Sequence, residues 1–383
     1  MLFSALVLLS YLSDLHIVSG SSCACSHVTI PVHVDALVPT DPTDAFAGLQ
    51  INASSVFQVN TDAFVPTDPT EVSPDLRRVN ETYDIAGTFC RPDVPSPQNA
   101  DVIQLLVHGF TYSSEYWSPS VAEFRNYSYA AFSCERGFAS LAIDQLGVGL
   151  SSRPSDPSDV QFPTSAAAIS EVARHLKSAS ILPGVPPFKK IIGIGHSVGS
   201  ALLTFNSIVE GTRSVFDGLI LTALLSVQPG TSFNIPLVGI TAQEANPDRW
   251  GSLHPGYFTT ENRSLFYPPN AHSYSPRMII HDNFTKDLGS ISIAMQLPTT
   301  SLEAEYTGAV AKVIGSEDRS FCVGTGRCDD VVALRAAEGA LWPAAKSFDL
   351  VVAQGSGHDM NLDFFAREAF ATLVEFVERF SRL

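Results

Sequence analysis

Short apolar runs alternate with longer amphipathic stretches from about residue 82 to the end of the chain. The runs are rich in Val, Ile and Leu and too short for typical helices, so they predict strands that are buried on both faces. The first run alternates apolar and polar residues like an edge strand. The predicted strands lie at residues 82–89, 101–107, 138–143, 191–194, 216–225, 309–314 and 348–353.

Two stretches outside these predicted strands have apolar residues at helical spacing. Residues 166–178 place Ile169, Val172 and Leu176 on one helix face, and residues 364–380 predict an amphipathic helix at the C-terminus. Parallel strands need helices on both faces of their sheet to be buried. The pattern therefore predicts an α/β fold, with a mostly parallel central sheet and helices on both of its faces.

This rhythm stops between the strands at 216–225 and 309–314. The stretch is rich in aromatic residues and proline, as in HPGYFTTENRSLFYPPNAHSYSP, and an unstructured loop of this length is uncommon in a compact domain. We expect residues 227–308 to form an inserted cap or lid over the C-terminal ends of the strands, where ligands bind in such folds. The alternative is a surface elaboration.

A serine stands between two glycines at the end of a predicted strand, in KKIIGIGHSVGSALLTF. Gly195 and Gly199 permit a sharp strand-to-helix turn, because a β-carbon at either position would strike the neighbouring strand or helix. Such a turn exposes the Ser197 hydroxyl beside a helix N-terminus, where a developing negative charge is stabilised. A plain helix cap is the alternative, and GHSVG alone does not decide between the two.

A nucleophilic serine needs a base and an acid that orients the base. His358, in VVAQGSGHDMN, and Asp318, in KVIGSEDRSF, each follow a predicted strand. Glu317 is the alternative acid, and a loop histidine or an acidic turn is usually only solvated. The order Ser197, Asp318, His358, each after a strand, is nevertheless specific. We predict that these residues are the nucleophile, the orienting acid and the general base.

The segment LLVHGFTYSSEYW follows another predicted strand and can supply an oxyanion hole. Gly109 lets the chain turn so that the N–H of Phe110 points toward the serine, and the N–H of Val198 is the expected second donor. His108 is expected to brace this loop by hydrogen bonds and to transfer no proton.

The charge and the spacing of motifs exclude several classes of partner. The formal net charge of −16 disfavours nucleic acid and anionic membrane surfaces, so we expect neither a nucleic-acid partner nor a stable membrane anchor. We also expect no cofactor and no metal. The turn at Gly147 and Gly149 lacks the lysine of a nucleotide-binding loop, and the cysteines lack the spacings of zinc sites. Oligomeric state is left open.

The N-terminal stretch MLFSALVLLSYLSDLHIVSG has the apolar core and small final residues of a secretory signal peptide, although no Lys or Arg precedes the core. Cleavage after Gly20 fits, and cleavage after Ala24 is the alternative. Sequons for N-glycosylation, which agree with secretion, occur at Asn52, Asn80, Asn126, Asn262 and Asn283. The expected parts are a signal peptide (1–20), an N-terminal extension of strands and loops (21–80), the first half of the core (81–226), the cap (227–308) and the second half of the core (309–383).

Six cysteines are compatible with disulfides in an oxidising compartment. Cys322 and Cys328 are near enough in sequence to close a small loop, which would stiffen the turn that carries the acid. Cys23 or Cys25 could reach Cys90, and the connectivity is otherwise left open.

These motifs together resemble the α/β-hydrolases from residue 82 to the C-terminus. The matching segments are HGF as the oxyanion loop, DQLGVGLSS after the next strand, GHSVG around the nucleophile, GSEDRSF as the acid turn and GSGHD as the histidine loop. The segments GTFC and LLVHGFTYSSEYW and the cysteines after the acid are similar to the secreted fungal branch of serine esterase- and lipase-like members. The N-terminal part resembles the family less.

The resemblance implies a serine hydrolase that cleaves carboxylic esters through an acyl-enzyme, because a single-glycine HGF loop is typical of esterases and lipases of this family. Ser197 in place of aspartate disfavours epoxide hydrolases and haloalkane dehalogenases. The same triad also serves lactonases, carbon–carbon hydrolases, cofactor-free peroxidases and hydroxynitrile lyases. A non-catalytic binding protein on a hydrolase scaffold is a further alternative. The aromatic cap favours a small hydrophobic ester or lactone as the substrate.

Overall fold

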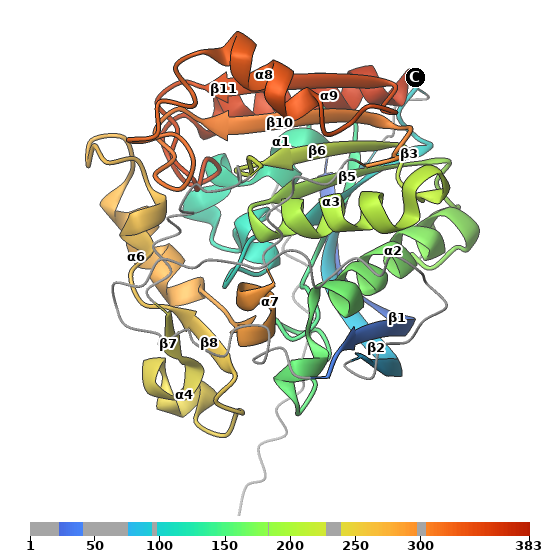
Figure 1. Cartoon of the computed structure of the whole chain (residues 1–383), viewed down its shortest axis with the longest axis vertical. Helices are drawn as coiled ribbons and strands as arrows, with labels where there is room; N and C mark the ends of the chain where they lie inside the picture. Colours follow the sequence, from blue (N-terminus) through green and yellow to red (C-terminus); the bar gives the residue numbers. More distant parts are fainter. Residues whose placement is uncertain (1–22, 41–75, 94–97, 183, 227–238, 297–303) are drawn as a thin grey trace, which may run out of the picture.

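The computed structural model describes residues 23–40, 76–93, 98–182, 184–226, 239–296 and 304–383. The expected signal peptide and the sequon at Asn52 lie outside these residues. The described part contains one large sheet flanked by helices and one smaller sheet (Figure 1).

The large sheet has eight strands in the order β1-β2-β4-β3-β5-β6-β10-β11. Its strands are β1 Cys23–Pro39, β2 Leu76–Pro92, β3 Val102–Val107, β4 Ala139–Ile143, β5 Lys190–His196, β6 Gly218–Thr222, β10 Ala309–Gly315 and β11 Ser347–Ala353. All neighbouring pairs from β4 to β11 are parallel, whereas β2 pairs antiparallel with both β1 and β4. The predicted mostly parallel sheet is confirmed.

The prediction of an edge strand at 82–89 is wrong. These residues lie in β2, which is flanked by β1 and β4, and the edge strand is β1. β1 and β2 form a long antiparallel pair, of which only residues 87–90 of β2 also pair with β4. The rest of β2 extends past β4, with one face in a buried hydrophobic cluster and the other face exposed. The alternation that suggests an edge strand comes from this overhang.

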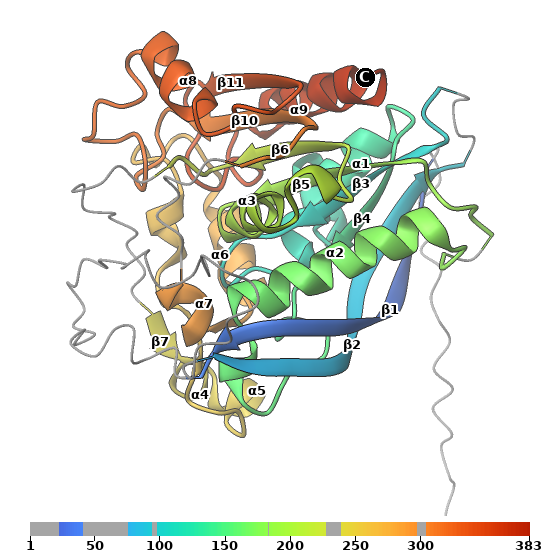
Figure 2. The same ribbon diagram turned by 45° about the vertical axis from the view of Figure 1, so that its right-hand side comes forward.

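Helices cover both faces of the large sheet, because each strand sends alternate side chains to opposite faces. In β3, Ile103 and Leu105 belong to one buried cluster, and Val102 and Leu106 belong to the other. The first cluster takes in α2 Phe162–Ser178, α3 Val198–Glu210 and α8 Val331–Gly339, and the second takes in α1 Tyr129–Cys134 and α9 Ala366–Ser381. Short 3-10 helices lie at η3 Ser114–Tyr116, η4 Ala122–Tyr127, η5 Pro157–Asp159 and η6 Gly211–Arg213. Figure 2 shows α2 and α3 side by side against the sheet.

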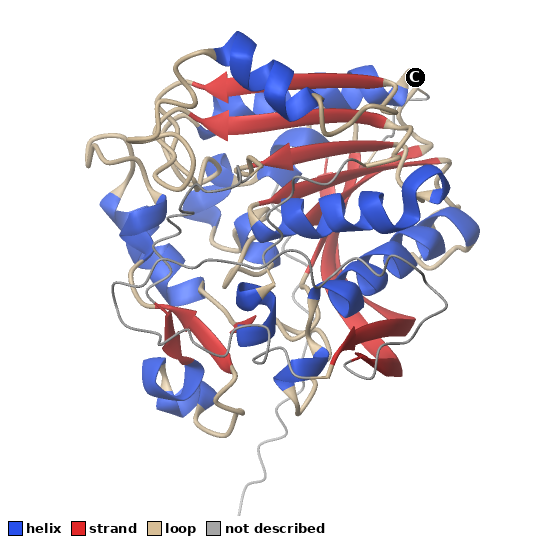
Figure 3. Ribbon diagram, in the orientation of Figure 1, coloured by secondary structure: helices blue, strands red, loops and turns tan. Residues whose placement is uncertain are grey.

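The chain between β6 and β10 forms the smaller sheet, which is antiparallel with the order β7-β8-β9. Its elements are β7 Gly239–Thr241, α4 Ala242–Ala245, α5 Pro247–Trp250, β8 Tyr257–Thr260, η7 Arg263–Phe266, α6 Pro276–Thr285, β9 Gly289–Ser290 and α7 Ile291–Met295. We call residues 239–295 the β7–α7 segment. Figure 3 shows its strands set apart from the large sheet. Elements this short carry no long periodic pattern, which explains why the sequence shows no βα alternation here.

Three disulfides join all six cysteines. Cys25–Cys90 links β1 to β2, and Cys23–Cys134 links β1 to the end of α1. Cys322–Cys328 closes a small loop after β10. The N-terminal strand is therefore tied covalently both to its neighbour in the sheet and to a helix on one face of the sheet.

Four of the five sequons fall within the described residues. Asn80, Asn126 and Asn262 are exposed, and Asn283 is partly exposed. Across the same residues, the helices are too short or too polar to cross a membrane.

Candidate active site

Ser197 stands on a tight turn between β5 and α3, in a backbone conformation with φ of 51°. Its N–H donates to the carbonyl of Thr222 on β6 at 2.9 Å. A Cβ at Gly195 would lie 2.5 Å from the backbone nitrogen of Ser200, and one at Gly199 would lie 2.2 Å from the carbonyl oxygen of Val107. Both flanking positions therefore require glycine, because backbone atoms occupy the space of any side chain.

The structure brings the three predicted triad residues together at the C-terminal ends of β5, β10 and β11. His358 Nε2 lies 2.9 Å from Ser197 Oγ, and His358 Nδ1 lies 2.8 Å from Asp318 Oδ2. His358 and Asp318 are buried, whereas Ser197 is partly exposed. With Nδ1–H donating to the carboxylate, Nε2 is the acceptor that faces the serine hydroxyl.

The second oxygen of Asp318 is also bonded, since Oδ1 accepts from the N–H of Ser320 at 2.7 Å. The alternative acid, Glu317, makes no hydrogen bond to His358 among the described contacts, and its N–H donates to the carbonyl of Ser356 at 2.9 Å. Burial lowers the pKa of His358, but the charge and hydrogen bond of Asp318, together with the charge of Asp359, raise the pKa above its ordinary value. The geometry selects Asp318 as the partner of the imidazole.

The HGF loop runs directly against the serine turn. A Cβ at Gly109 would lie 2.7 Å from His196 Cδ2 and 3.3 Å from Ser197 Cβ. The N–H groups of Phe110 and Val198 donate to no acceptor within the described part of the chain. Both predicted oxyanion donors are thus left without an internal partner beside the serine.

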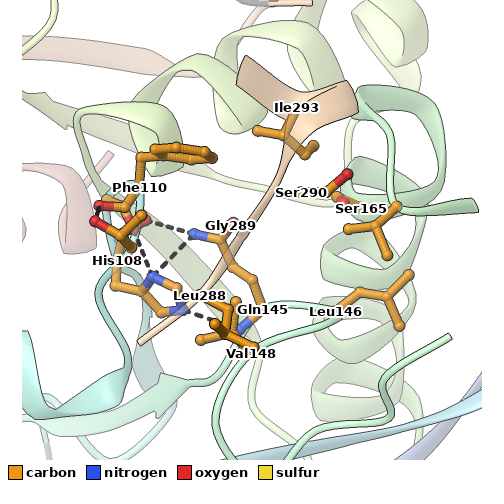
Figure 4. A pocket seen from close by; sticks show the side chains of 13 residues that line it. His108, Phe110, Gln145, Leu146, Val148, Ser165, Leu288, Gly289, Ser290 and Ile293 are labelled. Carbon is orange, nitrogen blue, oxygen red and sulfur yellow. Dashed lines mark hydrogen bonds between the residues drawn. The ribbon is translucent and has the colours of Figure 1, made fainter. Parts of the chain in front are cut away.

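His108 braces the loop, as expected. Its Nδ1 bonds the carbonyl of Gly109 at 2.7 Å, and its Nε2 accepts from the N–H of Gln145 at 3.0 Å. Burial lowers the pKa of His108, which keeps the imidazole neutral for these two bonds. Figure 4 shows this loop at the wall of a cavity that Leu288, Ser290 and Ile293 of the β7–α7 segment also line. The cavity measures about 10 Å³, close to the minimum for one water, so it is no substrate pocket.

A buried polar cluster beneath the triad has no counterpart in the sequence prediction. The Tyr112 hydroxyl donates to Asp359, the Tyr116 hydroxyl lies 3.1 Å from His196 Nδ1, and His196 Nε2 lies 3.4 Å from Asp359 Oδ1. Burial raises the pKa of Asp359 to about 6 and lowers that of His196 well below its ordinary range. His196 directly precedes Ser197 and Asp359 directly follows His358, and this adjacency is the one sequence signal that could have identified them.

A second part of the cluster comes from the β7–α7 segment. Arg263 is fully buried, its Nε lies 3.3 Å from Asp282 Oδ1, and its guanidinium lies 3.8 Å from the centre of the Tyr112 ring. Burial raises the pKa of Asp282 to about 7, although the charge of Arg263 opposes this rise. No pattern in the sequence marks Arg263 or Asp282, because they meet only through the fold. Among the described residues, no group of three or more His, Cys, Asp or Glu side chains is arranged to hold a metal ion.

The chain belongs to the alpha/beta hydrolase family, whose model matches residues 104–373. An epoxide hydrolase from Vigna radiata has a similar structure, with a TM-score of 0.51 and 13% identity over 78% of this chain and 95% of that chain. A thermophilic esterase from Thermogutta terrifontis has a TM-score of 0.50 and 14% identity over 81% of this chain and 96% of that chain. At these identities the likeness shows the common fold. No curated protein sequence matches the chain.

Proposed function

We propose that the protein is a secreted serine hydrolase that cleaves a carboxylic ester. The observation that carries this proposal is the chain of hydrogen bonds from Ser197 Oγ to His358 Nε2, at 2.9 Å, and from His358 Nδ1 to Asp318 Oδ2, at 2.8 Å. Distances of this kind allow the imidazole to take the serine proton while the carboxylate orients it and stabilises its positive charge.

The reaction has two half-cycles. In the first, His358 takes the hydroxyl proton as Ser197 Oγ attacks the ester carbonyl, and the N–H groups of Phe110 and Val198 bind the resulting oxyanion. The intermediate collapses to an acyl-enzyme, and the alcohol leaves with the proton from His358. In the second, a water gives its proton to His358 and attacks the acyl carbonyl, and Ser197 regains its proton as the acid leaves.

The substrate is proposed to be small and hydrophobic. Phe266 and Phe321 lie beside the base, with ring centroids 5.5 and 6.1 Å from that of His358. Phe266 belongs to the β7–α7 segment, which lies within the proposed cap of residues 227–308. An apolar wall at the base excludes water and favours an uncharged acyl or alcohol group.

The nucleophile argues for ester over epoxide hydrolysis, because Ser197 stands where the related epoxide hydrolases use aspartate. Lactones present the same carbonyl chemistry and stay a second candidate substrate class. A binding protein without activity is disfavoured by the complete set of nucleophile, base, acid and unpartnered N–H donors.

Secretion is supported by the apolar N-terminal stretch, the exposed sequons and the pairing of every cysteine. Cleavage after Ala24 would remove Cys23 and leave Cys134 unpaired, so we propose cleavage after Gly20. N-terminal sequencing of the secreted protein is expected to begin at Ser21. A mature chain that begins at Cys25 would contradict this proposal.

The test of activity is the hydrolysis of p-nitrophenyl acetate, butyrate and palmitate by the wild type and three variants. Ser197→Ala should reduce turnover to background, and Asp318→Asn should lower kcat on the order of 10⁴-fold by disturbing the tautomer of His358. Glu317→Gln is the matched control and should retain activity. The preferred chain length would size the acyl pocket.

Absence of turnover with every ester by folded wild-type protein would sink the esterase proposal. A panel of lactones would then test the second substrate class, again beside Ser197→Ala.

A further inference from the structure

The residue after the first oxyanion donor has an unusual backbone. Thr111 has φ of 60°, in the left-handed region, and among the described non-glycine residues only Ser197 and Ala223 also have a positive φ. A β-branched residue is disfavoured in this region and stays there only when its surroundings hold it. The N–H of Tyr112 donates to the carbonyl of Gly109 at 3.4 Å, so Phe110 and Thr111 are the central residues of a turn.

The contacts that hold Thr111 come from the β7–α7 segment. Arg263 donates from Nη2 to the carbonyl of Thr111 at 2.8 Å and from Nη1 to Thr111 Oγ1 at 3.0 Å. The N–H of Asp287 donates to the same carbonyl at 2.9 Å, and the hydroxyl of Thr260 bonds that of Thr111. The strained residue is thus bonded on its carbonyl and on its side chain by Thr260, Arg263 and Asp287, all of which are distant in the chain.

Phe110 is bound by the same segment. Its ring centroid lies 5.0 Å from that of Phe258, and a Cβ at Gly289 would lie 2.3 Å from the Phe110 ring. Arg263 itself is fixed by Asp282 and by the ring of Tyr112, so its two bonds to Thr111 start from a rigid position. The segment therefore determines the conformation of the turn that presents the Phe110 N–H.

We propose that Arg263 is a positioning residue for the oxyanion hole, which it serves by holding Thr111 in its left-handed conformation and so directing the N–H of Phe110 toward the developing oxyanion. This inference rests on the proposed serine hydrolase activity. Arg263 has no described contact with Ser197, His358 or Asp318, and it is bonded to the HGFT turn through its hydrogen bonds to Thr111. It differs from a structural anchor because its removal should weaken transition-state stabilisation more than substrate binding.

The experiment compares Arg263→Met, Arg263→Lys and the control Arg277→Met. Arg277 anchors the segment to η4 through Glu123 Oε2 at 2.6 Å, and it has no described contact with the HGF loop or with Asp287. For Arg263→Met we expect kcat to fall roughly 100-fold, as after loss of one oxyanion donor, with KM within about threefold of the wild type. The inhibition constant of phenylboronic acid, which forms a tetrahedral serine adduct, should rise with the fall in kcat.

Arg263→Lys keeps the charge beside Asp282 but replaces the planar pair of nitrogens that bonds Thr111 with a single nitrogen, so we expect an intermediate loss of kcat. If Arg263→Met does not fold, Arg263→Lys decides alone. Wild-type kcat and boronate affinity in a folded Arg263 variant, or a rise in KM with kcat unchanged, would overturn the inference. An equal fall of kcat in Arg277→Met would overturn it too, because it would show that any loss of a contact between the segment and the rest of the protein has this effect. Failure of the proposed function is a separate result, since wild-type protein would then neither hydrolyse an ester nor react at Ser197 with a fluorophosphonate.

Discussion

At the scale of single residues, the serine turn depends on the space left by Gly199. A Cβ there would lie 2.2 Å from the carbonyl oxygen of Val107 and 2.5 Å from that of His108. Both atoms belong to the backbone that leads into the HGF loop, so neither can rotate away. This close contact therefore also fixes the distance between Ser197 and the HGF loop.

We expect Gly199→Ala to lower the free energy of unfolding by roughly 1–3 kcal/mol, as for other overpacked sites, and to lower kcat by moving the HGF loop. Urea unfolding and ester turnover measure the two effects. Gly193→Ala on β5, the strand that leads to the serine turn, is the control, because the three atoms nearest to a Cβ there belong to the side chains of Leu219, Phe216 and Leu203, at 3.1 to 3.2 Å. Equal losses in the two variants would show that the backbone contact has no special role.

At the scale of elements, the triad could be predicted because its members follow strands. The carboxyl ends of parallel strands meet at one edge of a sheet, so Ser197, Asp318 and His358 had to lie near one another once β5, β10 and β11 were recognised. The order of these strands in the sheet was not needed. The sequence left open whether Asp318 or Glu317 bonds His358, because the side chains of adjacent residues point in different directions and the conformation of the turn decides which one faces the imidazole.

The buried cluster could not be predicted in this way. Arg263 and Asp282 lie in η7 and α6, short elements whose sequence has no apolar period, and their partners Thr111 and Tyr112 are distant in the chain. A buried arginine has the same appearance in a sequence as an exposed one. The edge strand was missed for a related reason, since the partner of β2 lies far upstream and its register is set only by pairing.

At the scale of the whole molecule, burial of carboxyl groups near the active site makes stability depend on pH. Burial raises the pKa of Asp363, which caps the histidine loop, to about 7 from 3.8. Between these values the folded state holds a proton that the unfolded state has released. The contribution of this group to stability is therefore present at low pH, is lost as pH rises toward 7, and is constant above it.

We expect the stability of the wild type, relative to that of Asp363→Asn, to decrease by up to about 1.4 kcal/mol per pH unit between pH 5 and 7. The variant also loses an acceptor for Ser356 and Gly357. This loss changes the difference in unfolding free energy by the same amount at every pH, so it does not alter the pH dependence. Urea unfolding of both proteins at several pH values measures the difference. A constant difference across this range would contradict the assigned ionisation.

Activity is expected to follow the opposite trend, because hydrolysis needs neutral His358 and the pKa of that imidazole is raised. Ester turnover should therefore increase with pH, while the contribution of Asp363 to stability decreases. Turnover and urea unfolding of the wild type, measured over the same series of pH values, test the two opposite directions.

The hydrogen bonds between the β7–α7 segment and Thr111 have a consequence for the design of chimaeric proteins. Segments that lie outside the main sheet are attractive modules to exchange when a new substrate range is wanted. Exchange of the β7–α7 segment would remove Thr260, Arg263 and Asp287, which are the partners of Thr111. A chimaera of this protein would therefore have to replace the HGFT turn together with the segment, because the conformation of one depends on the other.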